Sequence, residues 1–168
     1  MDKAQQELIR GYLVKAREKS AVARELLAKG HWDDAISRAY YAAFHAAQAA
    51  LLTEGQRGET HKGLVTLFGL LLVKPGKFEK KWGRFLANLK DDREAGDYEA
   101  LSFLDETTAR RAVEEAGEFV LQVEKYIQRL VSLYRSKYVP QKLHPLTFVL
   151  SPLEGGEGWG EGESSDVG

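Results

Sequence analysis

An apolar stripe at helical spacing in the last third of the chain sets the strongest limit on its fold. Between residues 106 and 137, apolar or small side chains recur at alternating steps of four and three residues, which places them on one face of an α-helix. Asp105 stands directly before this segment, where a carboxylate caps a first turn. The pattern therefore predicts a long amphipathic helix that needs neighbours to cover its apolar face. The stripe consists of Ala109, Val113, Ala116, Val120, Val123, Ile127, Leu130 and Tyr134.

Earlier segments show the same helical character and no stretch alternates with a period of two, so the sequence predicts no sheet. The predicted class is all-α: an antiparallel bundle of four to five helices. Residues 96–104 (GDYEALSFL) are predicted to connect the last two helices. The earlier predicted helices span 3–29, about 33–53 with Asp33 or Asp34 as cap, 61–74 after Thr60, and 78–95.

The sequence divides into a predicted helical bundle, residues 1–139, and a Gly- and Glu-rich segment, residues 140–168. The second segment has almost nothing to bury, which predicts a disordered tail. The formal net charge is −1, but the tail holds five acidic residues and one lysine, which leaves +3 on the bundle. A charge this small does not by itself predict nucleic-acid binding.

The chain has no cysteine, which excludes disulfides and thiolate metal sites. The N-terminal MDKAQQELIR lacks the apolar core of a secretory signal, and no apolar run approaches the roughly 20 residues that span a bilayer. We therefore expect a cytoplasmic protein that does not enter a membrane.

The second predicted helix, with the sequence SRAYYAAFHAAQAALL, carries a row of polar residues on an alanine-rich background. Arg38, Tyr41 and His45 share one helix face, and Asp34 and Gln48 extend the row. Two interpretations are open. The row is part of a functional site, or Arg38 pairs with Asp34 one turn away and His45 is a core-edge histidine with one satisfied nitrogen.

A second polar cluster lies in DDREAGDYEA, residues 91–100. Arg93 and Asp97 are one helical turn apart, and Tyr98 follows. These three side chains either hold a phosphate or form an ordinary ion pair beside a phenol.

His61 opens the third predicted helix, where the helix dipole disfavours a cationic imidazole. It is either a neutral donor at a site or a solvent-facing residue beside the cap. The four histidines are far apart, and HExxH, GxGxxG, GxxxxGK[ST] and GxSxG are all missing. The sequence therefore predicts no metal and no cofactor.

Taken in order, the SRAYYAAFHAAQAALL helix, THKGL, DREAGDY and a final long helix with AGEFV resemble the HEPN superfamily (higher eukaryotes and prokaryotes nucleotide-binding), in its small stand-alone prokaryotic branch. The resemblance covers about residues 3–130. It implies a homodimeric helical bundle whose partner is a minimal nucleotidyltransferase. In many such pairs the HEPN protein is a toxin that cleaves RNA without metal, and the transferase is the antitoxin.

Nuclease members of the family carry an arginine followed four to six residues later by histidine, near the start of the last long helix. The histidine suits proton transfer from the 2′-OH, and the arginine suits the phosphate charge. Here Arg93 is followed by Tyr98, and a phenol with a pKa near 10 is a poor base. His45 or His61 would have to supply the imidazole.

Two functions stay open: a module that binds nucleotide, RNA phosphate or its transferase partner, and a metal-independent RNase. The first uses Arg38, Tyr41, Arg93, Asp97 and Tyr98 on phosphate. The second adds His45 and His61 to the two arginines as catalytic candidates. Both require Arg38 and Arg93 to lie near one another.

Overall fold

The computed structural model describes the backbone of residues 1–98 and 105–138, and the side chains of residues 1–89, 105–134 and 136. This part of the chain is helical and contains no strand, so the predicted all-α bundle is confirmed. The predicted tail, residues 140–168, lies outside it. The elements are α1 (Lys3–Ala28), α2 (Trp32–Leu52), α3 (His61–Phe68), a π-helical segment η1 (Gly69–Val73), α4 (Lys80–Tyr98) and α5 (Glu106–Tyr138).

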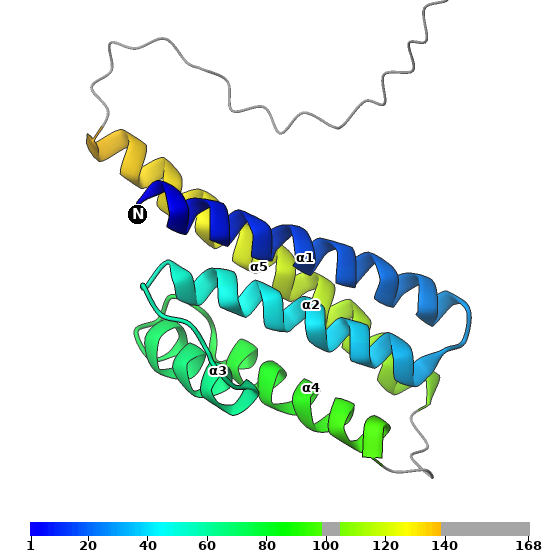
Figure 1. The fold of residues 1–168 in the computed structure, drawn as a ribbon. Coiled ribbons are helices and arrows are strands. Elements are labelled where there is room, and N and C mark those ends of the chain that lie inside the picture. The colour runs from blue at the N-terminus through cyan, green and yellow to red at the C-terminus, as the bar shows by residue number, and fades with distance from the viewer. Residues whose placement is uncertain (99–104, 139–168) are drawn as a thin grey trace, which may run out of the picture.

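The helix α2 lies at the centre of the bundle. It contacts α1, α5, α4 and α3, while the long helices alternate in direction along the chain (Figure 1). The C-terminal end of α4 therefore lies at the same end of the bundle as the beginnings of α2 and α5 (Figure 1). No helix of the described residues is long and apolar enough to cross a membrane.

Two helix ends differ from the sequence prediction. Neither Asp33 nor Asp34 caps α2, because the helix already begins at Trp32, and His31 occupies the cap position without a side-chain hydrogen bond. The two aspartates lie instead in the first turn, where negative charge is favourable to the helix dipole. At the other end, Gly96, Asp97 and Tyr98 belong to α4 rather than to the connector, so the predicted break at residue 96 is wrong.

Side-chain caps begin α1, α3 and α5, and those at Thr60 and Asp105 agree with the prediction. Asp2 accepts a hydrogen bond from the Gln5 backbone N–H at 2.7 Å, Thr60 from Gly63 at 3.0 Å and Asp105 from Thr108 at 2.8 Å. The π-helical segment continues α3 without a break, and its i+5 hydrogen bond joins the Lys74 N–H to the Gly69 carbonyl at 2.9 Å. The predicted third helix, 61–74, is thus one helix with a wider turn near its end.

The core has two parts with different side chains. The alanines of α2 are fully buried and let α1 and α5 approach closely, as the sequence predicted. Around α4, α5 and η1 the core is aromatic, with Phe68, Phe78 and Phe119 in ring contact. The buried alanines are Ala35, Ala39, Ala42, Ala43, Ala46, Ala47, Ala49 and Ala50.

Candidate functional site

Arg38 and Tyr41 lie near the beginning of α2 and are both partly exposed. No side chain in the described ranges forms a hydrogen bond or ion pair with Arg38, so the alternative of an Arg38–Asp34 ion pair is wrong. Asp34 is exposed to solvent. Tyr41 packs edge-on against the Tyr40 ring, with 5.4 Å between ring centroids. Among the side chains that the structure describes, the Arg38 guanidinium therefore has no anion beside it.

His45 lies further along α2 on the side that faces α1. Its ring centroid is 5.9 Å from that of Tyr12 and 5.7 Å from that of Phe44. Its Nδ1 atom is buried and has no hydrogen-bond partner within the described residues. Burial lowers the pKa of His45, and the positive charges of Lys15 and Lys19 lower it further. The imidazole is therefore a neutral base at neutral pH, and its exposed side is the one available to a ligand.

His61, the first residue of α3, is held by contacts with two aromatic side chains of α2. Its Nδ1 is hydrogen-bonded to the Tyr40 hydroxyl, and its ring centroid lies 5.0 Å from that of Phe44 and 5.1 Å from that of Tyr40. Because the imidazole is partly buried against these two rings, the alternative of a solvent-facing histidine beside the Thr60 cap is wrong. A hydrogen bond at Nδ1 fixes the orientation of the ring.

Phe44 lies between the two histidines. Its ring contacts His45 on the same helix and His61 from α3. The structure thus brings both predicted histidines to one partly exposed region of α2. Within the described part of the chain, neither histidine forms a hydrogen bond or ion pair with Arg38. Arg38 lies about two helical turns before His45 on α2.

Arg93, Asp97 and Tyr98 belong to the last two turns of α4, but their side chains lie outside the described residues. Their backbone is at the same end of the bundle as the beginning of α2 (Figure 1). The prediction that Arg38 and Arg93 share a site therefore stays a prediction.

Gln48 and Tyr40 both lie in the interior of the bundle, which the polar row on α2 does not predict. Gln48 was predicted to extend the polar row, but only 2% of it is exposed, and its amide bonds to the backbone of Gly58. Tyr40 is buried beneath His61. A signal for both was present: Tyr40, Phe44 and Gln48 are spaced four apart and form a second row on α2.

The acidic and histidine side chains that the structure describes form no group of three that could hold a metal ion. The side chains described in this region that can bind a ligand or transfer a proton are imidazole, guanidinium and phenol groups.

Comparison with known proteins identifies the fold. The family model of the HEPN domain matches residues 9–126. The chain belongs to the HEPN domain family. The match begins in α1, ends in α5, and includes every predicted site residue from Arg38 to Tyr98.

Relatives of this HEPN protein come from archaea and bacteria. A Methanocaldococcus jannaschii protein named "Putative toxin MJ0605" is 32% identical over 77% of this chain and 91% of its own length. A Thermotoga maritima UPF0332 protein is 31% identical over 74% of this chain and 95% of its own. The crystal structure of TT1696 from Thermus thermophilus is similar in fold, with a TM-score of 0.61 and 20% identity over 70% of this chain and 97% of that one.

Proposed function

We propose that this HEPN protein is one half of a toxin–antitoxin-type pair with a minimal nucleotidyltransferase, and that it binds the phosphate of RNA or of a nucleotide. In this proposal it acts as a homodimer. Arg38 and Tyr41 of α2 contact the ligand together with Arg93, Asp97 and Tyr98 of α4. Membership of the HEPN family and the name of the M. jannaschii relative support the proposal of a toxin–antitoxin-type pair.

The state of Arg38 is the observation that supports phosphate binding. A partly buried guanidinium is always charged, and removing it from water without an anion is unfavourable. The described side chains provide no anion, and the neighbouring side chain of Tyr41 is a phenol. Phosphate matches the planar donor set of arginine through two parallel hydrogen bonds. A phosphate is therefore a ligand that suits the Arg38 guanidinium.

The second candidate function is metal-independent RNA cleavage, which the two histidines favour. His45 is neutral at physiological pH, as a general base must be, because burial and two lysines lower its pKa. His61 has Nδ1 held by Tyr40, so Nε2 is the nitrogen that would exchange a proton with a substrate. In this function Arg38 and Arg93 stabilise the charge that develops on the phosphate.

The test is binding of the full chain to a fluorescent single-stranded RNA and to a labelled mononucleotide, with a chelator present. Because a hydrogen-bonded charge pair contributes about 1.5–3 kcal/mol, Arg38→Ala should weaken phosphate binding about tenfold or more. The matched control is Arg129→Ala, which removes the same charge from an exposed side chain on α5. It should leave binding nearly unchanged.

Cleavage of the RNA, and its loss on a substrate without the 2′-OH, would favour the second function over the first. The variants His45→Ala and His61→Ala would then show which imidazole is required for RNA cleavage. A folded chain that binds neither RNA, nor nucleotide, nor a minimal nucleotidyltransferase would contradict the proposal.

A further inference from the structure

One row of α2 faces the segment that leads into α3. Tyr40, Phe44 and Gln48 follow one another at intervals of four residues. Tyr40 and Phe44 contact His61. Gln48 contacts Gly58, which precedes His61 by three residues. The whole end of the α2–α3 connection therefore rests on three side chains of a single helix face.

The contact of Gln48 with Gly58 uses both polar atoms of the amide. Its Nε2 donates to the Gly58 carbonyl at 2.7 Å, and the Gly58 N–H donates to its Oε1 at 3.0 Å. The pair is buried, so no water is available to replace either hydrogen bond. Because buried backbone groups need partners, the connection is bound to α2 at one defined position.

Gly58 also contacts α3 closely. A Cβ atom at this position would lie 2.6 Å from the Cβ and 2.7 Å from the Cα of Leu64, a buried residue of α3. The backbone of Gly58 is thus enclosed between the amide of Gln48 and the first turns of α3. Gly58 therefore lies against α3, and His61 is the first residue of that helix.

We infer that Gln48 is a positioning residue for His61, acting through the backbone of Gly58. Without the amide pair, the connection would lose its attachment to α2, and His61 would lose its fixed approach to Tyr40 and Phe44. The relevance of this placement to RNA cleavage rests on the second proposed function, but the placement itself does not.

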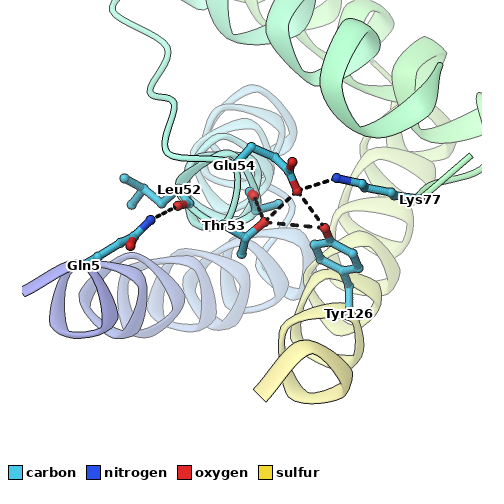
Figure 2. A network of polar contacts seen from close by, with 7 residues as sticks. Gln5, Leu52, Thr53, Glu54, Lys77 and Tyr126 are labelled. Atoms are coloured by element: carbon cyan, nitrogen blue, oxygen red, sulfur yellow. Dashed lines mark hydrogen bonds and ion pairs between the residues drawn. The ribbon is translucent and has the colours of Figure 1, made fainter. Parts of the chain in front are cut away.

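The beginning of the same connection has a separate attachment, which provides a control. Glu54 accepts a hydrogen bond from the Tyr126 hydroxyl at 3.1 Å and pairs with Lys77 at 2.6 Å, which joins the end of α2 to α5 and to the segment before α4 (Figure 2). Tyr126→Phe removes a hydrogen bond from the connection without touching Gly58 or His61.

The experiment compares Gln48→Met and Tyr126→Phe in the full chain by NMR of ¹⁵N-labelled histidine side chains. The wild type should show one His61 tautomer and ring-to-ring cross-peaks from His61 to Tyr40 and Phe44. In Gln48→Met the cross-peaks should disappear and the tautomers should mix, while the His45 signals stay in place. Tyr126→Phe should keep the wild-type His61 signature.

A folded Gln48→Met protein with wild-type His61 signals would overturn the inference. If that variant does not fold, amide hydrogen exchange of the wild type decides. Protection of the Gly58 N–H would support the pairing, and exchange at the rate of an open loop would overturn it. If His61 moves as expected and phosphate binding of the wild type is absent, the proposed function fails and the positioning inference stands. Where RNA cleavage occurs, misplacing His61 should slow it by about 100-fold.

Discussion

The two histidines beside Phe44 differ in how the protein holds them. His61 has a hydrogen bond at Nδ1 and contacts with the rings of Tyr40 and Phe44, and it follows the buried Gln48–Gly58 pair by three residues. His45 has ring contacts alone, and its buried nitrogen lacks a partner among the described residues. The comparison teaches that similar burial gives two kinds of imidazole: one set by hydrogen bonds, the other set by desolvation and nearby charge.

The largest effect should come from removing the ring that both histidines share. Phe44→Ala deletes a partly buried aromatic side chain, and we expect it to lower the free energy of unfolding by about 2–4 kcal/mol, below the range for a fully buried ring. Urea denaturation measures it. A loss below about 1 kcal/mol would mean that the two histidines do not depend on Phe44 for packing.

Gly58→Ala should affect the His61 side alone. The added methyl group meets the backbone of Leu64, so overpacking should destabilise the protein by about 1–3 kcal/mol. Gly11→Ala is the control, because a Cβ there meets nothing within 4 Å. That helical substitution should stabilise the protein by about 0.5–1 kcal/mol, so thermal unfolding should shift in opposite directions for the two variants.

A smaller effect separates the two tyrosines that accompany the histidines. Tyr40→Phe removes the hydrogen bond to His61 and should cost about 1 kcal/mol in chemical denaturation. Tyr12→Phe, beside His45, removes a hydroxyl that forms no described hydrogen bond and should change stability by less than about 0.5 kcal/mol. Equal losses in both variants would remove the distinction between a bonded and an unbonded histidine.

The smallest effect concerns pH. The pKa of His45 is lowered in the folded state, so the unfolded chain binds the proton first as pH falls. Its contribution to stability should be complete above the unfolded pKa of about 6.5 and should decline as pH falls from there toward the folded value. Between about pH 8 and 5, the free energy of unfolding should depend less on pH in His45→Gln than in the wild type, as urea denaturation at each pH would measure. Lys15→Gln should bring the folded pKa of His45 closer to the unfolded pKa, because it removes one of the repelling charges. The pH range over which stability declines should therefore become narrower.

Periodicity was enough to predict the class, the five helices and the buried alanine face of α2, since each depends on residues close in sequence. The same arithmetic also placed Arg38, Tyr41 and His45 correctly on a partly exposed face. It failed at Gln48 because a helical pattern gives the direction of a side chain but not the segment that later covers it.

The contact between Tyr40 and His61 could not be predicted for a related reason. The two residues are 21 positions apart, and the irregular connection between them has no periodic pattern. Its course depends on side-chain hydrogen bonds and on the close approach at Gly58, which are tertiary features. The extension of α4 through Tyr98 was missed because Gly96 resembled a helix stop, although one glycine inside a helix costs only about 1 kcal/mol relative to alanine.

The wider turn at Gly69–Val73 has a consequence for how the chain tolerates changes in length. A π-helical turn contains one residue more than an α-helical turn, so loss of one residue there would restore an ordinary helix without disturbing the preceding register. A deletion inside α2 would instead rotate every later side chain by about 100° and separate Tyr40, Phe44 and Gln48 from their partners. Natural variation in chain length should therefore concentrate at this turn, well after the residues that hold His61.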